Sequence, residues 1–168
     1  MLLYTDVLNN ELETLACAQS LANFIMDLQR VGTVNLKKNK TPLKIYFSGE
    51  IGAGKSCFIR EFLRNMGIKQ KIKSPTFSII ETYALEQFLY IHVDLYRLDN
   101  EEELYYLGLE EYEKDASIIL IEWPEKVKSL VKPDIQINLD SLYFGEKRKI
   151  SIQSISQLGE IIIQKLIN

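Results

Sequence analysis

An eight-residue segment, GEIGAGKS at residues 49–56, restricts what this chain can fold into more than any other part of its sequence. The segment fits the pattern G-x-x-x-x-G-K-[ST] of the phosphate-binding P-loop, which joins a strand to a helix. Its glycines leave room for a concentrated anion, which the backbone N–H groups and the positive end of the following helix can then hold. The pattern therefore predicts that the chain binds a nucleoside triphosphate.

The segments on either side of the P-loop give the required order of strand, loop and helix. Residues 43–48, LKIYFS, are a short apolar and aromatic run, which indicates a buried strand. Residues 57–66 carry their apolar side chains on one helical face. In such a loop the ammonium group of Lys55 would reach the β- and γ-phosphates, and the hydroxyl of Ser56 would ligate Mg²⁺.

A P-loop ATPase also needs an acidic side chain that holds Mg²⁺ or positions water near the loop. Glu122 directly follows the apolar run at residues 117–121. Asp94 ends the run at residues 88–93 in the same way. Because a charge at the end of a buried strand is unfavourable unless it faces a cation or a partner, we expect Glu122 to be the metal-binding carboxylate. We expect Asp94 to be catalytic, with an ion pair to Arg97 as the structural alternative.

The roles of several neighbouring side chains stay open. His92 is the only histidine and shares a strand face with Asp94, so that packing, hydrogen bonding and catalysis are all compatible with it. Trp123, just past Glu122, is either a stacking surface or a rigid strand exit. Thr76 stands before a strand-like run, where many NTPases keep a γ-phosphate sensor, although an ordinary turn is the simpler interpretation.

Composition and charge restrict the function classes. The 168 residues carry a formal net charge of −3 at pH 7, which argues against broad nucleic-acid binding. Lys69, Lys71 and Lys73 alternate beside the P-loop helix, and a solvated strand edge explains them more simply than a local basic patch does. Cys17 and Cys57 lack the C-x-x-C spacing of a redox or zinc site, so both are expected to be packing residues.

The apolar patterns predict one α/β domain over residues 1–168, a three-layer P-loop NTPase with its central motifs in residues 43–126 and late strands and a helix in residues 134–168. Residues 77–83 and 88–94 are separated by only four residues, which allows an antiparallel hairpin and excludes a crossover helix, so the sheet is mixed. Helices are expected over residues 10–32, 98–112 and 155–166, further strands over residues 135–139 and 148–152, and a polar, basic loop over residues 35–40.

No apolar run approaches the ~20 residues of a membrane span. Residues 1–6 lack the basic start and the long apolar stretch of a signal peptide. We therefore expect a cytoplasmic protein with no membrane partner.

Five segments carry a resemblance to a known family. They are, in chain order, GEIGAGKS at residues 49–56, KSPTF at 73–77, HVDLYRL at 92–98, LGLEEY at 107–112 and IEWPE at 121–125. Together they resemble the bacterial TsaE proteins, also called YjeE, which are ATPases needed for the threonylcarbamoyladenosine modification of tRNA.

The resemblance implies ATP as the nucleotide and Mg²⁺ as the metal, with Ser56 and Glu122 as metal ligands. It implies catalytic roles for Lys55, Asp94 and Glu122. The nucleotide contacts that it implies are Thr14, Glu50, Ile51, Gly52, Ala53, Gly54, Lys55, Ser56, Cys57, Thr76, Glu125 and Arg148.

The resemblance further implies that the protein acts on the TsaB and TsaD pair and involves tRNA only indirectly. The acidic residues between 99 and 115 would then form a docking face, although a solvated helix face is the simpler explanation. A small-molecule P-loop kinase is the alternative function, but no Arg-rich lid follows the P-loop. A GTPase would need the strings N-K-x-D and D-x-x-G, and neither occurs in the chain.

Overall fold

The computed structural model describes residues 1–36, 41–127, 129–142 and 147–167, and most of the loop expected at residues 35–40 lies outside this part of the chain. The strands are β1 (Leu3–Leu8), β2 (Leu43–Ser48), β3 (Ile80–Leu85), β4 (Phe88–Asp94), β5 (Ile118–Glu122), β6 (Ile135–Leu142) and β7 (Lys147–Ser154). The helices are α1 (Glu11–Arg30), α2 (Lys55–Asn65), α3 (Glu101–Tyr106), α4 (Leu109–Asp115) and α5 (Gln157–Ile167), with a short 3-10 helix η1 (Pro124–Lys126) after β5.

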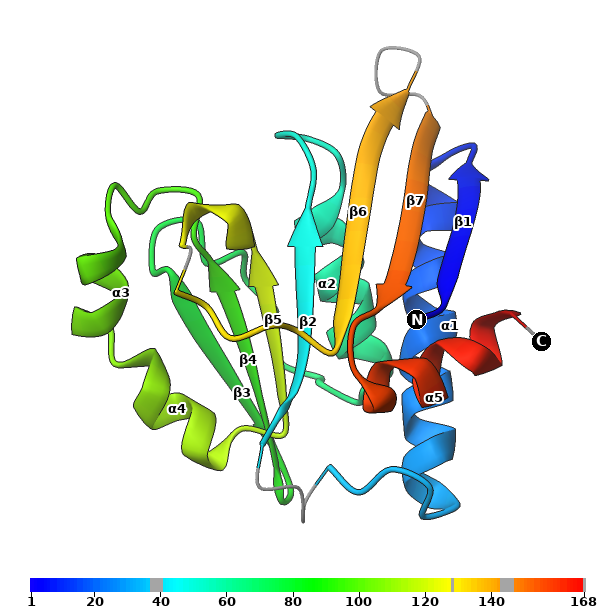
Figure 1. The fold of residues 1–168 in the computed structure, drawn as a ribbon, viewed down its shortest axis with the longest axis horizontal. Coiled ribbons are helices and arrows are strands. Elements are labelled where there is room, and N and C mark those ends of the chain that lie inside the picture. Colours follow the sequence, from blue (N-terminus) through cyan, green and yellow to red (C-terminus); the bar gives the residue numbers. More distant parts are fainter. Residues whose placement is uncertain (37–40, 128, 143–146, 168) are drawn as a thin grey trace.

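All seven strands belong to one mixed sheet in the order β1-β7-β6-β2-β5-β4-β3 (Figure 1). The central strand β2 is parallel to β5 and to β6, and β4 is parallel to β5. The remaining pairs, β3 with β4, β6 with β7 and β7 with β1, are antiparallel. The predicted hairpin and the predicted mixed sheet are both confirmed.

Helices cover both faces of the sheet, as the three-layer prediction requires. Successive side chains along a strand point to opposite faces, so one strand can pack against helices on both sides. In β2, Ile45 and Phe47 join a core cluster with buried residues of α1, α2 and α5. Tyr46, between them, joins a second cluster with Leu109 of α4. Figure 1 shows α3 and α4 on the side away from α1, α2 and α5. No described helix combines the length and the apolar character that a membrane crossing requires.

The parallel arrangement of β2, β4 and β5 positions the functional side chains. Parallel strands end at the same edge of a sheet, and ligands bind outside those carboxyl ends. In the observed register Asp94 at the end of β4 lies beside Glu122 at the end of β5. Glu122 in turn pairs with Phe47, two residues before the P-loop segment. Both carboxylates therefore lie at the edge of the sheet from which this loop starts.

The structure corrects several predicted boundaries. The strand expected from Phe77 begins only at Ile80, because residues 76–78 form a turn closed by the hydrogen bond from Ile79 N to Pro75 O at 2.7 Å. The helix expected over residues 98–112 is two helices, separated at Gly108, whose φ of +67° ends the first one.

Two further elements differ from the sequence interpretation. Strand β1 was not predicted; it is a largely exposed edge strand with little apolar alternation to mark it. Lys69, Lys71 and Lys73 were interpreted as a strand edge, but the segment that carries them is irregular and pairs with no strand in the described residues.

Candidate functional site

The P-loop runs from the end of β2 into the first turn of α2, and its glycines are required by their surroundings. Gly49 has φ of +134°, and a Cβ there would collide with the backbone oxygen of Leu139. Gly54 has φ of +105° and caps α2, and a Cβ there would lie 3.1 Å from Nε of Arg148. Glycine is therefore needed at both positions, because a side chain would meet neighbouring protein atoms and the positive φ disfavours other residues.

Lys55 is held in the centre of the loop. Its Nζ donates hydrogen bonds to the carbonyl oxygens of Gly49 at 2.6 Å and Glu50 at 2.9 Å, and it lies 3.8 Å from the centre of the Trp123 ring. Burial lowers the pKa of Lys55, while the charges of Glu122, Glu125 and Asp94 raise it. Lys55 is therefore a buried basic group that faces three carboxylates.

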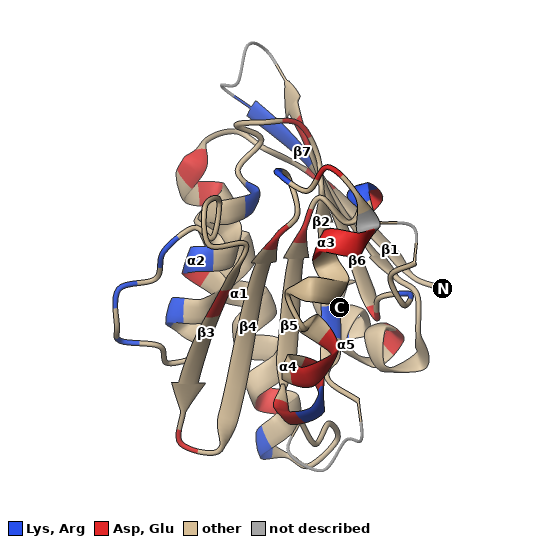
Figure 2. Ribbon diagram, turned by 90° about the vertical axis from the view of Figure 1, so that its left-hand side faces the viewer, with Lys and Arg blue, Asp and Glu red and all other residues tan. Residues whose placement is uncertain are grey.

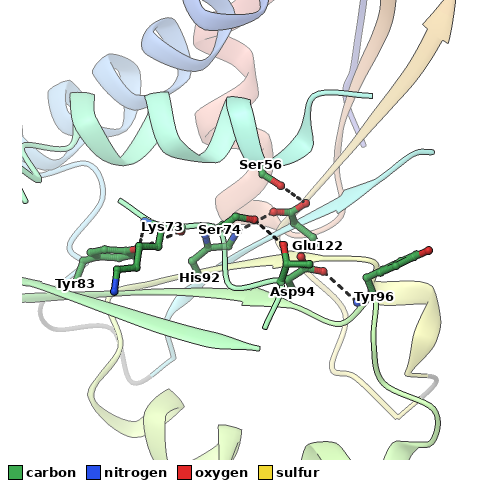
Figure 3. A network of polar contacts seen from close by, with 9 residues as sticks. Ser56, Lys73, Ser74, Tyr83, His92, Asp94, Tyr96 and Glu122 are labelled. Carbon is green, nitrogen blue, oxygen red and sulfur yellow. Dashed lines mark hydrogen bonds and ion pairs between the residues drawn. The ribbon is translucent and has the colours of Figure 1, made fainter. Parts of the chain in front are cut away.

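Glu122 is the centre of a buried hydrogen-bond network (Figure 3). Its Oε2 accepts a hydrogen bond from the Ser56 hydroxyl at 2.9 Å, and its Oε1 lies 2.9 Å from Nε2 of His92. The carboxylate is 2% exposed. The arrangement suits an imidazole that donates from Nε2 to the Glu122 carboxylate.

His92 itself is fully buried, and its Nδ1 has no hydrogen-bond partner among the described residues. Leaving a buried ring nitrogen unsatisfied disfavours the folded state by roughly 1–3 kcal/mol. Within the described residues, the hydrogen bond from the His92 ring goes to Glu122. This bond fixes the orientation of the carboxylate. Of the roles left open by the sequence, the structure shows hydrogen bonding.

Asp94 lies beside Glu122, at the end of the neighbouring strand β4. Its Oδ1 accepts a hydrogen bond from the Tyr96 backbone N–H at 3.1 Å, and the Thr76 hydroxyl bonds to the same carboxylate. Burial raises the pKa of Asp94, the charge of Glu122 adds to this rise, and the two hydrogen bonds oppose it. A carboxylate with a raised pKa is a better proton acceptor.

The ion pair between Asp94 and Arg97, the structural alternative, is not formed within the described residues. Arg97 instead lies over the ring of Phe77, with its guanidinium carbon 4.2 Å from the ring centre. Thr76, the candidate phosphate sensor, lies in a turn, as the simpler interpretation expected, yet its hydroxyl contacts the catalytic candidate Asp94 and is 3.0 Å from that of Ser74.

These side chains surround one hollow of about 310 Å³. Its lining residues are Ile51, Gly52, Gly54, Lys55, Ser56, Cys57, Thr76, Asp94, Tyr96, Glu122 and Trp123. Sequence reasoning missed Tyr96, and it left Trp123 undecided. Their rings lie 5.0 Å apart and form one wall. Tyr96 falls within the HVDLYRL segment, but no local pattern distinguishes it there from a packing residue.

Other predicted contacts, Thr14, Glu50, Ala53, Glu125 and Arg148, are not among its lining residues. Glu50 and Ala53 belong to the P-loop backbone, and the Ala53 carbonyl accepts a hydrogen bond from Nε of Arg148 at 3.1 Å. The Glu125 carboxylate lies 3.4 Å from the Ser48 hydroxyl, just before the loop. Thr14 is buried in α1, and its hydroxyl donates to the Asn10 carbonyl at 3.3 Å.

Cys17 is partly buried and packs against the main core, as predicted. Cys57 is also partly buried, but it lines the hollow. The Cys57 thiol lies 3.5 Å from a carboxylate oxygen of Glu11 at the start of α1. Burial raises the pKa of the Cys57 thiol, with further increases from Glu11. The raised pKa disfavours the thiolate, which is the nucleophilic form of a cysteine.

The Ser56 and Glu122 oxygens fit the coordination that Mg²⁺ prefers. They lie 2.9 Å apart. Mg²⁺ takes oxygen ligands at ~2.0–2.1 Å in octahedral geometry, so adjacent ligand oxygens are about 3 Å apart. No group of three or more His, Cys, Asp or Glu side chains among the described residues could hold a metal. Mg²⁺ commonly binds one or two protein ligands together with the phosphates of a substrate.

Comparison with known proteins gives a consistent result. The model of the family described as "Threonylcarbamoyl adenosine biosynthesis protein TsaE" matches residues 8–150. A Rickettsia felis protein named "tRNA threonylcarbamoyladenosine biosynthesis protein TsaE" is 41% identical over 158 residues, which cover 93% of this chain and 83% of that protein. A Haemophilus influenzae protein of the same name is 36% identical over 127 residues, which cover 75% of this chain and 79% of that protein.

Among solved structures, the crystal structure of Bacillus subtilis YdiB is similar, with a TM-score of 0.72 and 23% sequence identity. The superposition covers 99% of this chain and 95% of that one. This likeness supports the fold, including the terminal helix α5, which lies beyond the region that the family model matches.

Proposed function

This chain belongs to the TsaE family, and we propose that it is the ATP-binding and Mg²⁺-dependent ATP-hydrolysing subunit of the machinery that installs threonylcarbamoyl on tRNA adenosine. Membership of the family assigns the chain to tRNA threonylcarbamoyladenosine biosynthesis. The observation that carries the finer proposal is the convergence of Lys55, the Ser56–Glu122 pair and Asp94 on one hollow at the P-loop.

Phosphate binding would come from the loop and its lysine. The backbone N–H groups at the start of α2 and the Lys55 ammonium would hold the β- and γ-phosphates. Because Lys55 is buried and already faces carboxylates, its charge acts at close range in a poorly solvated place. The Trp123 ring on the other side of the ammonium keeps the lysine in position.

Hydrolysis would use the two carboxylates differently. Ser56 and Glu122 would hold Mg²⁺, which neutralises charge on the phosphates when it is bound. His92 would keep Glu122 in the required orientation through the Nε2 hydrogen bond. Asp94, with its raised pKa and its hydrogen bonds from Tyr96 and Thr76, would orient the attacking water and accept its proton.

The proposal includes the TsaB and TsaD proteins as partners, and this part rests on the family resemblance. ATP hydrolysis would reset the TsaB–TsaD pair between cycles, so that tRNA is involved only indirectly in this step. The nucleotide can bias the partners only if they bind its ATP and ADP states with different affinities. The acidic helices α3 and α4 (Figure 2) are the candidate docking surface on this subunit.

The test is steady-state ATP hydrolysis by the purified chain, alone and with TsaB and TsaD, with and without Mg²⁺. Lys55→Ala and Glu122→Ala should each remove the activity, while Lys165→Ala and Asp140→Ala, at exposed positions outside the site, should retain it. We expect weak hydrolysis alone and faster hydrolysis with both partners. Hydrolysis that the partners leave unchanged, or transfer of phosphate to a small molecule, would contradict the proposal.

A further inference from the structure

A second and larger hollow, of about 600 Å³, lies on the outer side of α2. Its walls come from the start of α1, from α2 and from the irregular segment at residues 68–72. The lining residues are Glu11, Leu15, Cys57, Arg60, Arg64, Ile68, Lys69, Gln70, Lys71 and Ile72. We call it the basic hollow. The smaller hollow of about 310 Å³ beside the P-loop is called the nucleotide hollow below. Only Cys57 belongs to the lining of both hollows.

The basic hollow concentrates positive charge on a chain that is negative overall. Arg60 and Arg64 come from α2, and Lys69 and Lys71 come from the segment that follows it. Glu11 is the one acidic residue in the lining, whereas the whole chain has a formal net charge of −3. Figure 2 shows the basic positions of α2 and of the segment between α2 and β3 on the same side of the molecule.

These cations are not neutralised by the protein itself. Within the described residues no carboxylate lies at ion-pair distance from Arg60, Lys69 or Lys71. Arg64 pairs with Glu61 at 3.4 Å, but its side chain is 62% exposed, so this pair contributes only about 0–1 kcal/mol. The hollow therefore keeps an attraction for an external anion.

The spread of the cations indicates what kind of anion fits. A single phosphate can contact only the cations nearest to it, whereas four basic side chains from two elements line this open hollow. A polymer with regularly spaced charges can meet several of them at once, which is how Lys and Arg residues bind nucleic-acid backbones. Gln70, between the two lysines, adds an amide that can donate to phosphate or to a sugar hydroxyl.

We propose that the basic hollow binds the phosphate backbone of RNA, namely the tRNA of the pathway to which the family belongs. The choice of RNA over an acidic protein segment rests on the proposed function. The contact is an added binding site on this subunit and does not place the tRNA in the nucleotide hollow. Lys69 and Lys71 are then phosphate-binding side chains rather than the solvated strand edge expected from the sequence.

The test is fluorescence anisotropy with a labelled, unmodified tRNA transcript and the full chain, without ATP or protein partners, at salt concentrations between about 50 and 200 mM. The double variant Lys69→Ala/Lys71→Ala should bind about tenfold more weakly, with a salt slope smaller by roughly 0.7–0.9 for each lost phosphate contact. The control double variant Lys149→Ala/Lys165→Ala removes the same charge from exposed positions outside the hollow and should bind within about twofold of the wild type.

The proposal is overturned if the chain does not bind the transcript, if both double variants weaken binding equally, or if polyglutamate competes as well as unlabelled tRNA. ATP hydrolysis by Lys69→Ala/Lys71→Ala should equal that of the wild type. If the wild-type chain binds the transcript but does not hydrolyse ATP, only the proposed function is overturned. The two failures are therefore distinguishable.

Discussion

The two hollows beside α2 use charged side chains in opposite ways. In the nucleotide hollow Lys55, Asp94 and Glu122 are at most 5% exposed, and each is held by hydrogen bonds to neighbouring groups. In the basic hollow Lys69 and Lys71 are exposed and make no ion pair among the described residues. Burial gives the first site fixed geometry, whereas exposure gives the second one additive and salt-sensitive attraction. Single substitutions should therefore have large effects in the first hollow and small ones in the second.

Glu122→Gln should give the largest effect. The substitution keeps the size of the side chain but removes the charge that Ser56 and His92 orient, so we expect hydrolysis of ATP to fall at least about 100-fold. Glu86→Gln is the matched control, because Glu86 is exposed in the turn between β3 and β4 and does not line the hollow. We expect a loss of less than about fivefold there. Equal losses in the two variants would show that burial is not what makes Glu122 important.

His92→Phe tests whether orientation of Glu122 depends on the buried hydrogen bond. Phenylalanine fills the space and removes the donor, so we expect the Mg²⁺ concentration for half-maximal hydrolysis to rise about tenfold, equivalent to ~1.4 kcal/mol. His92→Gln, which can still donate to Glu122, should recover part of this loss. If the two variants have the same Mg²⁺ dependence as the wild type, the histidine serves only packing.

Asp94→Asn should lower hydrolysis and raise stability. The pKa of Asp94 is raised in the folded state above its ordinary value of 3.8, mainly by burial. The unfolded state therefore loses its proton first as pH rises, and the ionised aspartate destabilises the fold at neutral pH. We expect Asn to raise the melting temperature near pH 7.5, by ~2–4 °C for each kcal/mol recovered.

This gain should shrink as pH falls and should vanish below 3.8, where Asp94 becomes protonated in both states. Thermal unfolding of both proteins across that pH range measures it. A gain that persists unchanged at the acidic end would mean that the buried charge of Asp94 is not its source.

Lys71→Ala should give the smallest effect, because Lys71 is exposed and makes no ion pair within the described residues. The free energy of unfolding should change by less than about 0.5 kcal/mol, and hydrolysis should not change. Chemical denaturation of the variant and the wild type measures this. A larger destabilisation would mean that the segment at residues 68–72 depends on its lysines for its own structure, which would weaken the contrast between the two hollows.

Most of the nucleotide hollow could be predicted from the sequence, because its signals are local. A glycine loop between a buried strand and a helix identifies Lys55 and Ser56 as phosphate and metal candidates. Glu122 follows an apolar run, where its charge needs a partner. The partnership of His92 with Glu122 could not be derived, since the register between β4 and β5 that brings them together depends on the whole sheet. Tyr96 was missed for the same reason.

The errors in the fold have equally specific causes. Ile79 adopts a φ of +63°, which a β-branched residue rarely does. Residue propensities therefore did not indicate the turn after which β3 begins, at Ile80. Strand β1 lies at the sheet edge, where few apolar positions are needed. The basic hollow combines side chains from α2 and from the segment after it, so its lysines looked like an ordinary solvated edge when considered by themselves.

The central claim is that Ser56 and Glu122 form the Mg²⁺ side of an ATP site, and calorimetric titration of ATP tests it most directly. The full chain would be titrated with ATP in excess Mg²⁺ and again in excess chelator, in parallel with Glu122→Gln. The account predicts that removing Mg²⁺ weakens ATP binding to the wild type by about tenfold or more, and that Glu122→Gln binds ATP almost equally in both conditions. The same Mg²⁺ dependence in the variant as in the wild type would contradict the account.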